Sequence, residues 1–320
     1  MKAIQIVEES LIWTEVDTPE PKKGEVLIKI LATAINRADL AQRSGNYPPP
    51  DGESDILGLE CSGEIVKVGK GIDEERIGEN VCALLAGGGY AEYVSCPSIQ
   101  AIKVPSNLSI IESASLPEVF ATCWLNLFIE GDLYKGQNIL LHAGASGIGT
   151  AAIQLCNSFG ANSFVTVGNE EKLKFCLDLG AKNGAVRGQG AFEEISSWAK
   201  SGFDLILDPV GGGYFPNNQR ILGLEGKLII IGLMGGVKSE INLGHLMMKR
   251  QKIIGSTIRA RHKELKGQVM KDLESIVWPL IEKNQIRPII FKTMNISEIE
   301  SAHKLMLKNQ NIGKIVIEVH

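Results

Sequence analysis

The sequence predicts an α/β protein of two domains, in which a doubly wound parallel sheet is inserted into a β-rich domain. Residues 1–118 hold short apolar runs between Gly- and Pro-rich turns, a pattern typical of a barrel-like β domain. Residues 119–263 alternate strand-like runs with helical segments, which favours a parallel sheet. Residues 264–320 return to the first pattern, so we expect the β-rich domain to be discontinuous.

Composition excludes several classes of protein. The 320 residues are 44% hydrophobic and 22% charged, with a net charge of −4, so they suit a globular protein with no nucleic-acid or membrane partner. No run of eighteen apolar residues and no signal-peptide core stand out. The six cysteines lie far apart without a C-x-x-C motif, which suits a reducing compartment. We therefore expect a cytoplasmic protein.

The elements follow in order along the chain. In the β-rich domain we expect strands at 26–31, 64–68, 80–85 and 90–94, then a helix at 264–282, a strand at 289–294 and a last strand at 313–319. A helix after residue 297 is expected to begin with a capping box of Ser297 and Glu300. Residues 36–50 begin as a helix and end in a Pro-rich loop that carries Tyr47.

The inserted domain is expected to alternate between five strands and five helices. The strands are 138–142, 163–167, 203–207, 227–231 and 252–256, and the helices are 119–130, 147–159, 170–179, 191–200 and 213–222. The first strand leads through Gly144, Gly147 and Gly149 into a helix. This arrangement suits a pyrophosphate site, but the spacing departs from G-x-G-x-x-G. The glycines alone are weak evidence for a nucleotide and leave an ordinary strand–helix turn open.

Several longer motifs resemble a known family. They are residues 36–40 (NRADL), 45–50 (GNYPPP), 56–60 (ILGLE), 142–155 (HAGASGIGTAAIQL) and 311–316 (NIGKIV). With these motifs the chain resembles the medium-chain dehydrogenase/reductases, in the zeta-crystallin-like, tumour-suppressor-inducible quinone oxidoreductase branch. The resemblance implies a GroES-like catalytic domain at 1–118 and 264–320, and a Rossmann domain that binds NADPH at 119–263.

Comparison with zinc-dependent members of the family argues against a metal. Those enzymes have a Cys where Asn36 stands and a His where Leu59 stands, and they carry a lobe of four cysteines that has no counterpart here. Zinc needs several nitrogen or sulfur ligands held close together. The resemblance therefore implies no metal, and a structural polar role for Glu60.

The cofactor prediction rests on the end of the second Rossmann strand. An NAD site usually carries a carboxylate there, whereas this strand ends in Gly168-Asn169. Lys172 falls where the family's lysine for the 2′-phosphate lies, which favours NADPH. The family usually has Ser in place of Asn169 and Tyr in place of Arg187. We hypothesise that Arg187 contacts the 2′-phosphate or the adenine.

The resemblance also assigns the remaining site residues and a dimer. The expected cofactor-binding residues are Thr122, Gly144, Ser146, Gly147, Ile148, Gly149, Gly168, Asn169, Lys172, Arg187, Gly232, Leu233, Met234, Asn311, Gly313 and Lys314. Tyr47 and Asn36 are expected to hydrogen-bond the oxygen of the acceptor. In the family's strand order, strand 227–231 forms an apolar edge of the Rossmann sheet, and an edge of this kind needs covering. We therefore predict a homodimer.

The expected reaction is the transfer of reducing equivalents from NADPH to a quinone. Without zinc no Lewis acid polarises an alcohol or ketone, and a quinone needs less activation. An unperturbed phenol of pKa ~10 makes Tyr47 a poor acid, so the proton donor stays open, as does one- or two-electron reduction. The alternatives are an enone or enoyl-thioester reductase on the same scaffold and a catalytically idle NADPH-binding protein.

Overall fold

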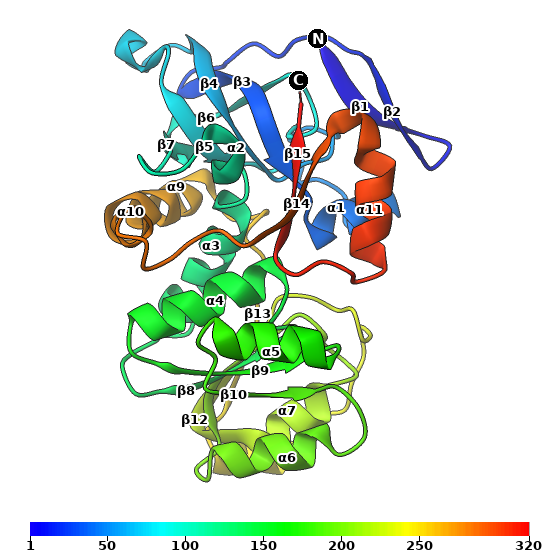
Figure 1. The fold of residues 1–320 in the computed structure, drawn as a ribbon, viewed down its shortest axis with the longest axis vertical. Helices are drawn as coiled ribbons and strands as arrows, with labels where there is room; N and C mark the ends of the chain where they lie inside the picture. The colour runs from blue at the N-terminus through cyan, green and yellow to red at the C-terminus, as the bar shows by residue number, and fades with distance from the viewer. Residues whose placement is uncertain (320) are drawn as a thin grey trace. The chain divides into compact units, whose positions relative to one another are not determined.

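The computed structural model describes residues 1–319 and contains two compact units. Unit 1 comprises residues 1–121 together with the residues from 258 onward, and unit 2 comprises residues 122–257. The chain thus leaves unit 1, forms unit 2 and returns to unit 1 (Figure 1).

Unit 1 is built on a seven-stranded sheet and a separate hairpin. The sheet runs in the order β14-β15-β3-β4-β5-β7, with β6 also paired to β3, and β1 pairs with β2. The strands are β1 (Lys2–Val7), β2 (Ser10–Glu15), β3 (Glu25–Ala34), β4 (Glu60–Val68), β5 (Asn80–Leu84), β6 (Tyr93–Pro97), β7 (Ala101–Lys103), β14 (Ile290–Asn295) and β15 (Lys314–Glu318). The helices are α1 (Arg37–Arg43), α2 (Ile110–Ser113), α3 (Pro117–Cys123, which runs into unit 2), α9 (Lys263–Asp272), α10 (Trp278–Glu282) and α11 (Ile299–Leu307).

The central strand of unit 1 is β3, because it is paired with other strands along both of its edges. Val26, Ile28 and Ile30 enter one apolar cluster, whereas Ala32 and Ala34 enter another. β3 pairs antiparallel with β4, β6 and β15. The last strand of the chain is therefore bonded directly to a strand from its first tenth, and the two sequence-distant halves of the unit share one sheet.

Unit 2 is a six-stranded parallel sheet with helices on both faces. The strand order is β10-β9-β8-β11-β12-β13, and every pairing is parallel. The strands are β8 (Asn138–His142), β9 (Asn162–Val167), β10 (Asn183–Val186), β11 (Phe203–Asp208), β12 (Leu222–Ile230) and β13 (Lys252–Gly255). The helices are α4 (Gly147–Ser158), α5 (Glu170–Asp178), α6 (Ala191–Trp198), α7 (Phe215–Ile221) and α8 (Leu243–Met248).

The strand order of unit 2 reverses between β8 and β11, where an open α/β sheet binds its ligands. In Figure 1, α4 and α5 lie above strands β8–β10 and α6 and α7 lie below them. The core on the side of α6 and α7 is rich in aromatic residues, and Phe164, Phe203 and Phe215 belong to the same cluster. The structure confirms the predicted fold class, a β-rich unit into which a doubly wound parallel sheet is inserted.

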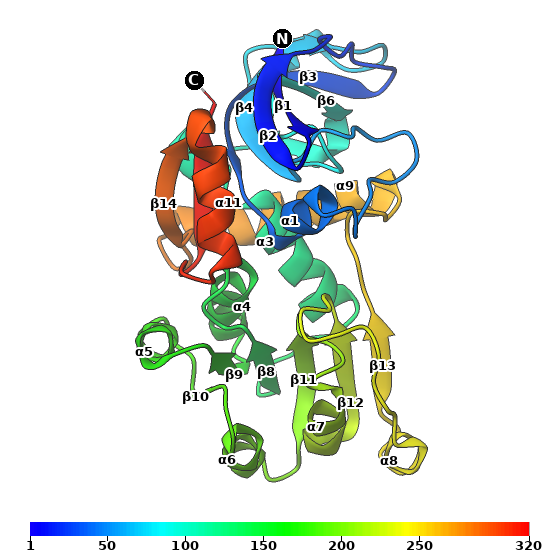
Figure 2. The same cartoon turned by 90° about the vertical axis from the view of Figure 1, so that its right-hand side faces the viewer.

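Three local expectations are wrong. Strand 227–231 is not an edge, because β12 pairs with β11 on one side and β13 on the other; Figure 2 shows β13 outside β12. The sixth strand, β10, was not expected, since Asn183–Val186 carries too few apolar residues to signal a strand. The capping box lies two residues earlier than expected, at Asn295 and Glu298. The backbone amide of Asn295 donates to Oε2 of Glu298 (3.1 Å), and Oδ1 of Asn295 accepts from the amide of Ser297 (3.0 Å).

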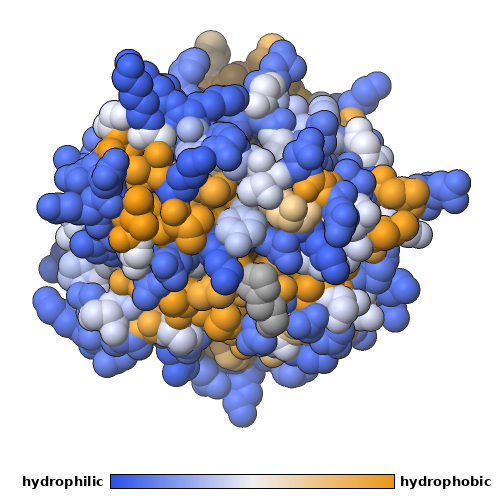
Figure 3. Space-filling model, turned by 90° about the horizontal axis from the view of Figure 1, so that it is seen from above, coloured by the Kyte–Doolittle hydropathy of each residue, from blue (hydrophilic) through white to orange (hydrophobic). Residues whose placement is uncertain are grey.

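The surface and the helices add two findings. The face seen in Figure 3 mixes hydrophilic side chains with apolar patches that they interrupt. Within residues 1–319, the helices are all too short or too polar to cross a bilayer.

Candidate active site

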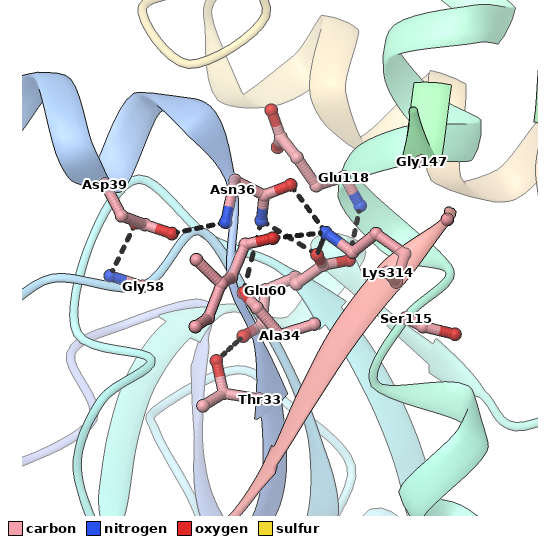
Figure 4. A network of polar contacts seen from close by, with 12 residues as sticks. Thr33, Ala34, Asn36, Asp39, Gly58, Glu60, Ser115, Glu118, Gly147 and Lys314 are labelled. Atoms are coloured by element: carbon pink, nitrogen blue, oxygen red, sulfur yellow. Dashed lines mark hydrogen bonds and ion pairs between the residues drawn. The ribbon is translucent and has the colours of Figure 1, made fainter. Parts of the chain in front are cut away.

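A buried lysine joins three segments of unit 1. Nζ of Lys314, at the start of β15, donates to the carbonyl oxygen of Ile35 (3.0 Å), Oδ1 of Asn36 (2.6 Å) and Oε1 of Glu60 (2.7 Å). Lys314 is 4% exposed and Glu60 is fully buried. All three N–H donors of the ammonium are therefore used, and its charge faces one carboxylate, as Figure 4 shows.

Asn36 serves this network and the start of α1. Its side-chain amide donates to Oε1 of Glu60 (2.8 Å) and to the carbonyl oxygen of Ala34 (3.3 Å), while its Oδ1 accepts from Lys314. Its backbone amide donates to Oδ2 of Asp39 (2.7 Å). The donors of the Asn36 side chain are thus engaged inside unit 1.

A second buried carboxyl group, Asp39, supports the loop before β4. Its Oδ1 accepts from the amide of Gly58 (3.1 Å) and its Oδ2 from the hydroxyl of Tyr90 (3.0 Å). Burial raises the pKa of Asp39 to about 6, although these bonds and the charge of Lys314 act against the rise. The Tyr90 hydroxyl also lies 3.2 Å from Nε2 of His303, whose pKa burial lowers to about 4.

Tyr47 is held by a buried arginine. Arg259 is 3% exposed and donates to the carbonyl oxygens of Ala86 (2.7 Å) and Tyr47 (3.2 Å) and to Oε1 of Gln42 (2.7 Å). Its guanidinium also lies over the Tyr47 ring, 5.2 Å from the centroid, in cation–π geometry. Burial and the nearby Glu118 raise the pKa of the Tyr47 phenol, and Arg259 opposes them. Tyr47 is therefore a neutral phenol at pH 7 that can donate a hydrogen bond.

Glu118, near the start of α3, is a half-buried residue with one unsatisfied carboxyl oxygen. Its backbone amide donates to Oε2 of Glu60 (2.9 Å). Its own Oε2 is buried and has no hydrogen-bond partner among residues 1–319. In Figure 4 its carboxyl group points away from Glu60 and Lys314. Burial and the charge of Glu60 raise the pKa of Glu118 to about 8, so its protonated form is favoured at pH 7.

The glycine turn of unit 2 lies between β8 and α4. A Cβ on Gly144 would lie 2.7 Å from the Val165 side chain, and one on Gly149 would lie 2.4 Å from the carbonyl oxygen of Gly144, so both positions require glycine. Ser146 caps α4 by accepting from the amide of Gly149 (3.0 Å). The first-turn amides of a helix have no acceptor within the helix, which leaves those of Gly147 and Ile148 suited to an anion.

The tip of β9 carries the residues expected at the cofactor's ribose. Asn169 caps α5, because its Oδ1 accepts from the amide of Lys172 (2.9 Å). The amide of Arg187 donates to the carbonyl oxygen of Val167 (2.9 Å), and its Nη2 lies 3.9 Å from the position of a Cβ on Gly168. Burial raises the pKa of Tyr214, and the nearby charge of Arg187 opposes that rise. A guanidinium therefore lies at this strand tip, beside a glycine.

The other residues expected to bind the cofactor lie after β12, in α3 and just before β15. Gly232 packs against the backbone of Pro209, whereas Leu233 and Met234 are about half exposed. Thr122 is buried, and its neighbour Cys123 donates to the carbonyl oxygen of Ile148 (3.3 Å). In unit 1, Nδ2 of Asn311 donates to the carbonyl oxygen of Gly313 (2.7 Å), and Gly313 needs its positive φ of 75°.

The predicted residues fall into two groups, and the sequence missed part of one. In unit 2 the glycine turn, the tip of β9, Arg187 and residues 232–234 all follow the carboxyl ends of strands in one parallel sheet. In unit 1, Asn36 and Lys314 meet directly. The sequence did not single out Glu118 or Gln42, because a Glu near a helix start or a Gln within a helix reads as solvated. For the turn 258–261, which contains Arg259, the sequence left two interpretations open: a segment that closes over the nicotinamide or a basic surface turn.

Groups of potential metal ligands are absent from the described residues: no three His, Cys, Asp or Glu side chains in 1–319 are arranged to hold an ion. The six cysteines are all buried and unpaired.

Two family models match the chain over separate ranges. The alcohol dehydrogenase GroES-like domain matches residues 22–106, and the zinc-binding dehydrogenase family matches residues 147–275. Among solved structures, an NAD-dependent alcohol dehydrogenase is 25% identical with a TM-score of 0.87 over 100% of both chains. The human synaptic vesicle membrane protein VAT-1 homolog-like protein is 25% identical with a TM-score of 0.83, covering 97% of this chain and 94% of that one.

Curated relatives are distant but match nearly the whole chain. Quinone oxidoreductase of Rattus norvegicus is 27% identical over 99% of this chain and 97% of its own length. The synaptic vesicle membrane protein VAT-1 homolog of Danio rerio is 27% identical over 93% of this chain. Highly-reducing polyketide synthase 1 of Aureobasidium melanogenum is 28% identical over 94% of this chain. The chain spans 65% of the VAT-1 homolog and 14% of the polyketide synthase.

The fold combines a β-rich unit with a doubly wound parallel sheet that carries the glycine turn. The chain belongs to the medium-chain dehydrogenase/reductase superfamily and is of its quinone-oxidoreductase-like kind.

The buried ion pair gives the first prediction. Lys314→Met should lower the free energy of unfolding by about 3–5 kcal/mol, because it leaves the Glu60 charge buried and unpaired. Adding Glu60→Gln should recover most of that loss. Urea denaturation of the three proteins measures it, with Lys67→Met as control: its ion pair with Glu20 is exposed and should change stability by less than about 1 kcal/mol. Equal losses in the single and double variants would contradict the pairing.

Proposed function

We propose that the protein transfers reducing equivalents from NADPH to a quinone without a metal ion. The observation that carries this proposal is the buried Lys314 ammonium, bonded to Asn36 and Glu60. The polar groups at this place in unit 1 are thus satisfied by an internal cation. Leu59 beside them is apolar and buried, so the set of side chains does not suit zinc, which needs several nitrogen, sulfur or oxygen ligands.

The residues of unit 2 fit a dinucleotide with a 2′-phosphate. The amides of Gly147 and Ile148 would hold the pyrophosphate at the start of α4, in a turn whose two glycines no other residue could replace without a clash. Arg187, with Asn169 and Lys172 at the start of α5, would hold the ribose phosphate. The tip of β9 itself, Gly168-Asn169, carries no carboxylate, and Glu170 and Glu171 follow in the first turn of α5. When bound, the reduced nicotinamide supplies a hydride.

The residues of unit 1 fit an acceptor that carries a carbonyl oxygen. Tyr47 keeps its phenolic proton at neutral pH, and Arg259 fixes its ring and backbone. It would donate a hydrogen bond to the acceptor oxygen. The donors of Asn36 are engaged, so we assign it a positioning role toward Lys314. A quinone suits this site because it accepts electrons without strong polarisation of its carbonyl group.

The first experiment on this proposal follows NADPH oxidation in the presence of a chelator. We expect turnover of 1,2-naphthoquinone with no loss on adding EDTA, and much slower turnover of an enone or of crotonyl thioester. Faster turnover of the enone or the thioester would favour an enoyl reductase. Tight NADPH binding without any turnover would favour an idle binding protein, and loss of activity with EDTA would contradict metal independence.

The role of Arg187 is tested by the choice of cofactor. Arg187→Ala should weaken NADPH binding about tenfold, because it removes a charge-assisted contact of about 1.5 kcal/mol. NADH, which has no 2′-phosphate, should bind equally to both proteins. Titration calorimetry measures the two dissociation constants, with Lys174→Ala on α5 as control. An unchanged constant for NADPH would contradict the assignment.

We also propose a homodimer formed through the outer edge of unit 2. The structure supports it through β13, whose outer side is unpaired within residues 1–319, and through α8, where Leu243, Met247 and Met248 are 66–72% exposed. Sedimentation equilibrium at micromolar concentration should give twice the monomer mass. Met248→Glu should shift the mass toward the monomer and Leu177→Glu on α5 should not. A monomeric mass for the unmodified protein would contradict the dimer.

A further inference from the structure

We propose that Glu118 delivers the proton that completes reduction of the acceptor. This inference rests on the proposed function, because it names the acid of the same reaction. It starts from a geometric observation: the Oε2 atom of Glu118 is buried, has no partner within residues 1–319 and belongs to a side chain that points away from Glu60 and Lys314. A buried polar atom of this kind costs free energy unless something bonds to it, and the acceptor oxygen can do so.

The backbone amide of Glu118 is hydrogen-bonded, whereas Oε2 of its carboxyl group is not. The bond from its amide to Oε2 of Glu60 anchors α3 to β4. Glu60 therefore accepts three hydrogen bonds: its Oε1 accepts from the Lys314 ammonium and the Asn36 side-chain amide, and its Oε2 accepts from this backbone amide. The Lys314 ammonium is bonded to Glu60 and not to Glu118. Burial and the Glu60 charge together keep the pKa of Glu118 near 8.

The groups that act on Glu118 come from every element around it. Glu60 on β4 and Asp39 on α1 raise its pKa, whereas Lys314 on β15 and Arg259 before α9 lower it. Lys266 on α9 and Tyr47 in the Pro-rich loop also feel its charge. Glu118 thus shares an electrostatic environment with Tyr47, the residue proposed to hold the acceptor.

Tyr47 and Glu118 then have different tasks. The pKa of Tyr47 is raised above that of an ordinary phenol, which keeps its proton in place for a hydrogen bond and makes it a poor acid. The best general acid has a pKa near the working pH, and Glu118 meets that condition. The surroundings thus give Tyr47 and Glu118 different pKa values, as in other acid–base pairs.

The step balances in atoms and electrons. Two-electron reduction of a quinone adds one hydride, which leaves an anionic oxygen on the product. The O–H bond of the Glu118 carboxyl group breaks and a new O–H bond forms on that oxygen. The resulting carboxylate takes up a proton from solvent before the next turnover. The net change is consumption of one NADPH and one proton per quinol released.

The test compares Glu118→Gln, which keeps the shape and removes the acidic proton, with Glu64→Gln on the exposed part of β4. In the unmodified protein kcat should fall as pH rises past about 8, because the carboxylate cannot donate. Glu118→Gln should lose about 100-fold in kcat, should lose this pH dependence and should keep its KM for the quinone. Glu64→Gln should behave as the unmodified protein does.

A second readout does not depend on turnover. Infrared spectra of the protein without ligands should show a protonated carboxyl band at pH 7 that disappears as pH rises past about 8 and is missing in Glu118→Gln. Unmodified kcat and pH profile in Glu118→Gln would overturn the proton-donor role and leave quinone reduction intact. Failure of the unmodified protein to reduce any quinone would overturn the proposed function and this role with it, whatever the infrared spectra show.

Discussion

The buried pair of Lys314 and Glu60 is the interaction on which the architecture of unit 1 depends. The insertion of unit 2 divides unit 1 into two chain segments. Within unit 1 these segments are held together by noncovalent contacts alone. β15 does so by pairing with β3, and Lys314 at its start reaches the end of β3 and the start of β4. A buried ion pair adds little net stability compared with an apolar pair, but losing one partner is costly. Its main contribution is therefore to fix the position of three backbone segments.

The same pair sets the charge of the candidate acceptor region. One ammonium faces two carboxyl groups, Glu60 directly and Glu118 at longer range. Lys314 and Arg259 both lower the pKa of Glu118, but burial and the charge of Glu60 outweigh them and raise it to about 8. The network that joins the two chain segments also leaves one acidic proton beside a neutral phenol. Structural and chemical roles are combined in this one group of residues.

Much of the fold was predictable from the sequence because it depends on local pattern. The alternation of apolar strands and helices predicted five of the six strands of unit 2, and the glycine turn was predictable because Gly144 and Gly149 have no room for a side chain. β10 could not be predicted, since a four-residue strand is stabilised by its neighbour β9 and not by its own composition. The edge of the sheet could not be predicted either, because strand order depends on which crossover packs outermost.

The candidate site was predictable only in part, for a similar reason. Residues that must be glycine or must cap a helix leave a signal in the sequence, whereas Glu118 and Arg259 resemble any charged surface residue. Their burial results from the packing of segments up to about two hundred residues apart, such as Arg259 with Gln42. The most direct measurement of the account is a crystal structure with NADPH and a quinone bound. The account predicts one quinone oxygen within hydrogen-bond distance of Tyr47 or Glu118, and Lys314 still bonded to Glu60. A quinone bound away from both residues, or a metal ion in place of the Lys314 ammonium, would contradict it.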